Sequence, residues 1–204
     1  MRSILITFFL LFILNSGFTK NLNDVVYANE IHWYGVDFTN AKMIGSTGFT
    51  HPDIICDRYI KEKWNTYVFN EKDKYDIGKF LKGKEVVNHL DFILERNSVI
   101  TTDNLIINHD HQIEQSAIKN TITSYNTNER GIGLVFIVES FNKLEESASI
   151  WVTFFDIHTN ELIYTREYEV EPGGFGVLNY WLGSIYETCK QLRKDYRKWH
   201  REFS

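Results

Sequence analysis

Hydrophobic positions form three strand-like runs in the second half of the chain. Ile132 to Phe141 is apolar on both faces of an extended chain, which is typical of a central strand covered on both sides. Ile150 to Ile157 follows, and Leu162 to Val170 alternates between apolar and polar positions. Because short polar breaks join the three runs, the pattern predicts an antiparallel meander. A further strand is predicted over Ile31 to Phe38, and it can resume at Ala41 to Ile44.

Helical spacing marks three other segments. Apolar residues recur every three or four positions from Ile54 to Val68, and again within residues 110–125. A longer apolar stripe runs from Leu178 to Trp199, so one helix is predicted from the glycine-rich turn before it to about Glu202.

Together these elements predict a single α/β (α+β) domain over residues 31–204. In it an antiparallel three-stranded meander plus an N-terminal strand packs against amphipathic helices, including the long C-terminal helix. Residues 18–30 are polar and are predicted to be an extended lead-in. The pattern of residues 85–96 fits a helix and an edge strand equally well, so both alternatives stay open for this segment.

The first residues have the layout of a secretory signal peptide. Arg2 gives a short positive start, Ile4 to Leu14 is a run of eleven uncharged and mostly apolar residues, and Asn15-Ser16-Gly17 supplies small or polar residues. The run is shorter than the about 20 residues that a membrane-spanning helix needs. Residues 1–17 are therefore predicted to be removed on export. The mature chain is expected to be periplasmic or extracellular, with no transmembrane segment.

Composition and charge narrow the classes of protein. With 43% hydrophobic and 15% aromatic residues the chain is expected to fold, and the formal net charge of -5 argues against a nucleic-acid-binding protein. Positive charge is concentrated in residues 190–201, where six cationic residues surround one Asp. Such a cluster complements a helix dipole, or it attracts an acidic partner or a membrane surface. The first interpretation is favoured because Tyr196 and Trp199 continue the core stripe.

Two cysteines leave one disulfide to consider. Cys56 and Cys189 can pair, because an exported protein meets oxidising conditions. Both positions also fit half-buried helices, where two free thiols are typical core residues.

One histidine-rich segment has the residue types of a metal site. His109 and His111, with Glu114, could supply two imidazoles and one carboxylate to zinc. Asp110 is equally well interpreted as the N-cap of the following helix, and no second ligand pair supports the site. No metal and no cofactor is therefore assigned.

A glycine-rich turn precedes the long helix. The backbone at Gly173, Gly174 and Gly176 could hold an anion at the helix start, but the spacing of known phosphate loops is absent. A tight turn from strand to helix is the favoured interpretation. Asn179 and Trp181 are expected to be architectural, with Trp181 in the core stripe and Asn179 bonded to the backbone of the turn.

Four segments carry a family resemblance. They are Gly131 to Lys143, Phe155 to Thr159, the Gly-Gly-Phe-Gly turn with Asn179-Tyr180-Trp181, and Gly35 to Phe38. In these segments the chain resembles a family of uncharacterised exported bacterial proteins that has no assigned activity. That family places a basic residue before the Asn, where this chain has Leu178. More loosely, the order of elements is similar to that of curli secretion-channel and Tol-Pal propeller amino-terminal domains, which are assembly modules.

The expected function is that of an exported, non-enzymatic binding or assembly module of the bacterial envelope, whose partner is another envelope protein. It rests on the signal layout and on the lack of a nucleophile–base or metal set with convincing spacing. The alternative is a small secreted hydrolase whose site is assembled from scattered Asp, Glu and His residues, since catalytic residues need to be neighbours only in space. The strand-associated carboxylates are the candidates for that site: Asp37, Asp91, Glu139 and Asp156.

Overall fold

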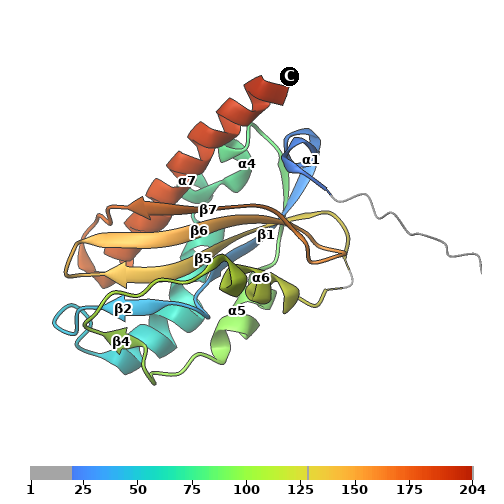
Figure 1. Cartoon of the computed structure of the whole chain (residues 1–204). Helices are drawn as coiled ribbons and strands as arrows, with labels where there is room; N and C mark the ends of the chain where they lie inside the picture. The colour runs from blue at the N-terminus through green and yellow to red at the C-terminus, as the bar shows by residue number, and fades with distance from the viewer. Residues whose placement is uncertain (1–19, 128, 204) are drawn as a thin grey trace, which may run out of the picture.

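The computed structural model describes residues 20–127 and 129–203 (Figure 1). The predicted signal peptide, residues 1–17, lies outside the described residues. Within them, seven strands form one sheet, and helices pack on both of its faces. None of the helices in these ranges has the length and apolar character needed to cross a membrane.

The longest strand, β5 (Ile132–Asn142), is the centre of the sheet. One edge of β5 pairs along its length with β6 (Ser147–Asp156), and β6 pairs with β7 (Leu162–Val170); both pairings are antiparallel. The other edge is shared by two strands that run parallel to it. β1 (Glu30–Asp37) pairs with its first half and β2 (Lys42–Ile44) with its second.

Two short strands complete the sheet beyond β1 and β2. β3 (Glu85–Asn88) lies parallel to β1, and β4 (Ile106–Ile107) lies parallel to β2. Four of the six strand pairings are therefore parallel.

The predicted fold class is wrong. The described chain folds into a mostly parallel seven-stranded sheet with helices, an α/β fold, and not into an antiparallel meander with one added strand. Parallel neighbours need crossover connections of a dozen or more residues, usually helical. The helix-rich chain between β2 and β5 supplies these crossovers, so His32 of β1 lies opposite Gly133 of β5. Hydrophobic periodicity depends on neighbouring residues, so it does not predict which strands pair when they lie far apart in the sequence.

The helices occupy the connections and the two ends of the described chain. Their bounds are α1 (Leu22–Tyr27), the π-helical η1 (Ile54–Lys63), α2 (Trp64–Asn70), α3 (Lys72–Tyr75), α4 (Ile77–Phe80), α5 (Leu90–Ser98), α6 (Gln115–Thr123) and α7 (Gly176–Phe203). α7, η1 and α2 pack into the larger hydrophobic core on one face of the sheet. α6 packs into a smaller core on the opposite face (Figure 1).

Three segments differ in detail from the sequence-based expectation. Residues 18–30, predicted to be extended, include the helix α1. Its N-cap residue is Asn21, whose side chain accepts a hydrogen bond from the Asn23 amide. The undecided segment 85–96 is a strand followed by a helix, because β3 ends at Asn88 before α5 begins. The helix within 110–125 starts only at Gln115, with Glu114 as its N-cap residue in place of Asp110.

A bulge in β1 decides which of its side chains reach the larger core. Ile31 and Trp33 point into that core. At Gly35 the backbone has a φ of +78°, and the register with β5 shifts between Trp33 and Val36. The extra residue returns Val36 and Phe38 to the same core. The alternate side chains of β1 lie on the opposite face, at His32, Tyr34 and Asp37.

Candidate metal centre

Three side chains from distant parts of the chain meet beside the first half of β1. His32 lies on β1, His89 follows β3 and precedes α5, and Glu129 lies in the loop between α6 and β5. The sheet register brings them together because β1 pairs with both β3 and β5. The His89 amide also donates a hydrogen bond of 2.9 Å to the carbonyl oxygen of Trp33. This contact fixes the start of α5 against the strand.

The three donor atoms have the mutual spacing of a tetrahedral metal site. Nδ1 of His32 lies 2.9 Å from Nε2 of His89. The Glu129 Oε2 atom is 3.3 Å from the first nitrogen and 3.4 Å from the second. Ligand atoms at the zinc–nitrogen and zinc–oxygen distances, about 2.1 Å from a tetrahedral ion, are about 3.4 Å apart. In this structure the two imidazoles form a hydrogen bond with each other, so a bound ion would replace that bond and would need the two rings to tilt and their nitrogens to separate by about 0.5 Å.

Neighbouring groups orient the His32 ring. Its other nitrogen, Nε2, lies 3.3 Å from Oε1 of Glu30. A carboxylate on the far nitrogen is the usual outer partner of a metal-bound histidine, because it fixes the ring and its tautomer. Gly131 leaves room for the ring: a Cβ atom at that position would lie 3.0 Å from two atoms of the imidazole.

The surroundings of His89 favour its neutral form, the form that binds metal. The ring stacks on Tyr34 with centroids 4.4 Å apart. Burial lowers the pKa of His89, and the charge of Glu129 opposes the shift. The side chains of His32 and His89 are 11% and 13% exposed, whereas that of Glu129 is 47% exposed. The two imidazoles of the site are thus largely buried, whereas the carboxylate is accessible to solvent.

Two hydroxyl groups near this site are buried without a hydrogen bond of normal geometry. They belong to Tyr34 and to Thr127, which lies two residues before Glu129. Burial raises the pKa of Tyr34 to about 12, so its hydroxyl stays protonated at neutral pH. A contact with the Thr127 side chain opposes this shift, so the two hydroxyls face one another beside the cluster.

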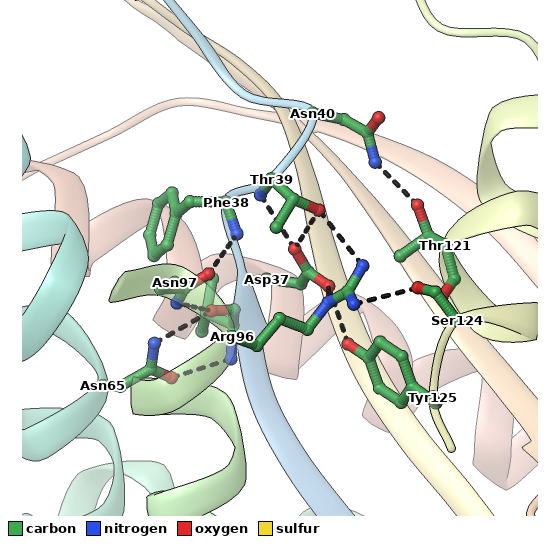
Figure 2. A network of polar contacts seen from close by, with 11 residues as sticks. Asp37, Phe38, Thr39, Asn40, Asn65, Arg96, Asn97, Thr121, Ser124 and Tyr125 are labelled. Carbon is green, nitrogen blue, oxygen red and sulfur yellow. Dashed lines mark hydrogen bonds and ion pairs between the residues drawn. The ribbon is translucent and has the colours of Figure 1, made fainter. Parts of the chain in front are cut away.

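A second polar cluster closes the break between β1 and β2 (Figure 2). The carboxylate of Asp37 is fully buried and accepts hydrogen bonds from Arg96, from the Tyr125 hydroxyl at 2.8 Å, and from the amide and hydroxyl of Thr39. Ser124 accepts a further hydrogen bond from Arg96 at 2.9 Å. Donors within the protein satisfy both oxygens of Asp37, which is typical of a structural ion pair and not of an acid–base catalyst.

Two asparagines replace the ladder hydrogen bonds that the bulge removes. Asn65 on α2 accepts from the Val36 amide and donates to the Val36 carbonyl oxygen, both at 2.8 Å. Asn97 on α5 accepts from the Phe38 amide at 3.0 Å and donates to the same carbonyl oxygen at 2.9 Å. The side chains of two helices thus hold β1 in place at the bulge (Figure 2), and with it the His32 ring.

The structure does not bring the sequence-based metal candidates together. His111 contacts the Asn40 carbonyl oxygen at 3.1 Å, and His109 and Glu114 are exposed. Among the described residues, these three are not part of a group of ligand atoms close enough for one ion. Sequence analysis missed His32, His89 and Glu129 because no short spacing links them. The one available signal was the polar His32 between the apolar Ile31 and Trp33 of a predicted strand.

The remaining candidate residues are packed or bonded locally. Cys56 and Cys189 are both buried and both free thiols, and Cys56 donates to the Ile100 carbonyl oxygen. The disulfide considered from the sequence is therefore not present in this structure. Of the strand carboxylates, Glu139 accepts hydrogen bonds from an amide and from Trp151, and Asp156 pairs with Lys20.

The glycine-rich turn connects β7 to α7, as the sequence predicted for a strand-to-helix turn. A Cβ atom at Gly173 would have no atom within 4 Å, whereas a Cβ atom at Gly174 would lie 2.7 Å from the Asn179 carbonyl oxygen. Gly174 and Gly176 both have positive φ. Asn179 donates to the Phe175 carbonyl oxygen at 3.3 Å, and Trp181 is buried in the larger core.

Comparisons with known proteins add little. No known family matches the chain, and no curated protein sequence matches it. Lipoprotein GNA1162 from Neisseria meningitidis is similar in structure, with 9% identity and a TM-score of 0.33, over 80% of this chain and 95% of that one. An uncharacterised protein is similar with 10% identity and a TM-score of 0.32, over 86% of this chain and 93% of its own. Likenesses of this size carry no conclusion about fold or function, so the resemblances drawn from the sequence stay predictions.

Proposed function

We propose that this chain is an exported binding module of the bacterial envelope that holds one divalent transition-metal ion through His32, His89 and Glu129. The observation that carries the metal site is the spacing of the three donor atoms, 2.9 to 3.4 Å. The outer partner Glu30 and the close approach of Gly131 support it. Export and an envelope partner rest on the signal layout of the sequence.

Zinc is the ion that this donor set fits best. The two imidazoles are borderline ligands that suit zinc, and a carboxylate oxygen also binds zinc, whereas calcium and magnesium prefer sites made only of oxygen atoms. Zinc also accepts four-coordinate geometry without preference from its d-electrons. Three protein ligands leave a fourth position, which water or a group on a partner would fill.

The open fourth position also favours the second candidate function, a small zinc hydrolase. Catalytic zinc sites typically have three protein ligands and a bound water. Apart from the ligand Glu129, the carboxylate that contacts His32 is Glu30, and it is engaged with the far nitrogen of the ring. A hydrolase would therefore need a base from another group, and the binding function remains the proposal.

Metal stoichiometry and affinity test the site directly. We expect one zinc ion per chain by elemental analysis of protein purified without a polyhistidine tag. In calorimetric titration, His32→Ala with His89→Ala should lower zinc affinity at least 100-fold, since ligand losses remove most of the binding energy. The His109→Ala with His111→Ala variant removes the same number of imidazoles and should bind zinc as the unmodified chain does.

Glu129→Gln keeps the proposal testable if the double histidine variant does not fold. Its side chain is half exposed, so the fold should tolerate the change while zinc affinity falls at least about 10-fold. The proposal would be contradicted if the two double histidine variants lost zinc affinity equally, or if the unmodified chain bound no zinc at neutral pH. Hydrolysis of ester or peptide substrates by the zinc-loaded chain alone, and lost in Glu129→Gln, would favour the enzyme.

Export is tested separately, by mass spectrometry of the exported protein. The expected N-terminus lies between Asn15 and Lys20. Exported material that still begins at Met1 would rule out the predicted signal peptide.

A further inference from the structure

The outward face of α7 carries an unusual concentration of cations, which we call the cationic file: Lys190, Arg193, Lys194, Arg197, Lys198 and Arg201. At 100° per residue, all six fall within an arc of about 140°. The buried residues of the same segment, Leu192, Tyr196 and Trp199, lie on the opposite side of the helix. Packing against the sheet therefore directs the whole file to the surface.

Most of this charge is not neutralised within the described part of the chain. Arg193, Arg197 and Arg201 are exposed and form no ion pair there. Asp195 is the acidic residue within the segment, but its carboxylate accepts hydrogen bonds from Arg166 and Tyr168 on β7. Asp195 therefore interacts with β7 and does not neutralise the neighbouring cations of α7.

The helix dipole does not account for the length of the file. Dipole interactions act within the last turn of a helix. From Lys190 to Arg201 the helix rises about 17 Å, or three turns, at 1.5 Å per residue. Most of the cations are therefore beyond the region in which the dipole would favour them.

Other groups border the file. A groove of about 420 Å³ between α4 and α7 is lined by Lys74, Lys79 and Arg193, but also by Asp73 and Asp76, and Asp76 pairs with Lys79 at 3.3 Å. At the C-terminal end of α7, Tyr27 of α1 is 60% exposed and Phe203 is 38% exposed. The Tyr27 hydroxyl donates to the Phe203 carbonyl oxygen, and Figure 1 shows α1 beside this end of α7.

We propose that the cationic file docks on the surface of an anionic phospholipid bilayer. The six cations form a strip about three turns long on one side of the helix, and each Lys or Arg that comes near an anionic surface adds to binding. The apolar face of α7 is packed on the sheet, so attachment is electrostatic and reversible.

Vesicle sedimentation tests this proposal on the exported, processed chain. At low salt we expect binding to vesicles that contain phosphatidylglycerol, and none to vesicles of phosphatidylcholine alone. Binding should vanish near 0.5 M NaCl, where screening shortens the Debye length to about 4 Å. The variant R193Q/R197Q/R201Q should lose roughly 100-fold in partitioning, about 5-fold for each cation.

A matched variant, R58Q/K63Q/K119Q, removes the same charge from η1 and α6 and should keep most of the binding. Because the metal site is a separate feature, His89→Ala should bind vesicles as the unmodified chain does. Two results would overturn the proposal. The first is no binding to anionic vesicles at low salt, even if the file binds an acidic protein. The second is an equal loss of vesicle partitioning in the two triple variants.

Discussion

At the scale of single residues, Gly35 shows how one backbone conformation distributes side chains between the two faces of the sheet. Its φ of +78° belongs to the left-handed region that favours glycine. The bulge there adds one residue to β1, which keeps Val36 in the larger core and places Asp37 with Arg96 on the other face. Without it, the alternation of a strand would bury an ionised group among apolar side chains.

Gly35→Ala is therefore expected to destabilise the fold by about 2–5 kcal/mol, from backbone strain and overpacking together. The added Cβ atom would lie 2.6 Å from Asn65 Oδ1 and 2.7 Å from the Phe69 ring. Gly83 also has positive φ but has no atom within 4 Å of such a Cβ, so Gly83→Ala should cost only about 1–2 kcal/mol. If urea denaturation shows that both variants lose the same free energy of unfolding, a packing role for Gly35 is contradicted.

The Trp181 side chain gives a second prediction at this scale. It stacks on Phe141 of β5 at 4.6 Å and on Phe49 at 5.4 Å. Trp181→Ala should lower the free energy of unfolding by about 3–5 kcal/mol, the usual cost of truncating a buried aromatic residue.

Phe175 provides the control for Trp181, because it lies in the adjoining turn and is 95% exposed. Phe175→Ala should change stability by no more than about 0.5 kcal/mol. A Trp181→Ala protein that unfolds like the unmodified chain but loses a ligand would make the segment a functional surface.

At the scale of elements, the interruption between β1 and β2 depends on side chains from outside the sheet. The two strands share one edge of β5, and the chain leaves that edge between them. Arg96 of α5 and Tyr125 after α6 reach this break and bind Asp37. The helices on both faces thus hold a strand that is not continuous.

Removal of Arg96 should be costly for this reason. Arg96→Ala leaves a fully buried carboxylate without its cation, which is expected to cost about 3–5 kcal/mol. Arg166 also pairs with an aspartate, but on the surface, and Arg166→Ala should cost no more than about 1 kcal/mol. Chemical denaturation of the two variants side by side measures the difference, and similar losses would count against a structural role for the buried pair.

At the scale of the whole molecule, a metal ion would join three parts of the chain that the sheet alone brings together. An ion that binds only the folded state stabilises it by about 2.7 kcal/mol at a free concentration 100 times its dissociation constant. For a chain of this size we expect zinc to raise Tm by about 5–10 °C at neutral pH. The rise should disappear in His89→Ala and persist in the His109→Ala with His111→Ala variant.

The pH dependence follows from the lowered pKa of His89. Because burial disfavours its charged form, the unfolded chain takes up a proton at this residue first, near pH 6.5. The contribution of His89 to stability is thus complete above that pH and declines as pH falls toward the lowered pKa of the folded state. Protons also compete with zinc for the ring, so the zinc-dependent rise in Tm should shrink below about pH 6.5. A zinc effect on thermal unfolding that stays constant from neutral to acidic pH would contradict His89 as a ligand.

Local pattern in the sequence identified the main elements but not their arrangement. The predicted strand over Leu162 to Val170 has the bounds of β7, and the long C-terminal helix extends to Phe203. The predicted sheet class was wrong, because β3 and β4 are too short to leave a pattern and β1 pairs with strands far along the chain. The metal candidates chosen for their close spacing, His109 and His111, were not the histidines that the fold brings together.

The sequence by itself determined where the longer strands and helices form, because periodicity is a property of neighbouring residues. It also determined the signal layout and the concentration of cations in residues 190–201. Only the tertiary structure decided that β1 lies between β3 and β5, and so that His32, His89 and Glu129 meet. The physical reason is that strand register and loop closure are set by the packing of the whole core. A site assembled across three strands therefore has no signature in any one segment.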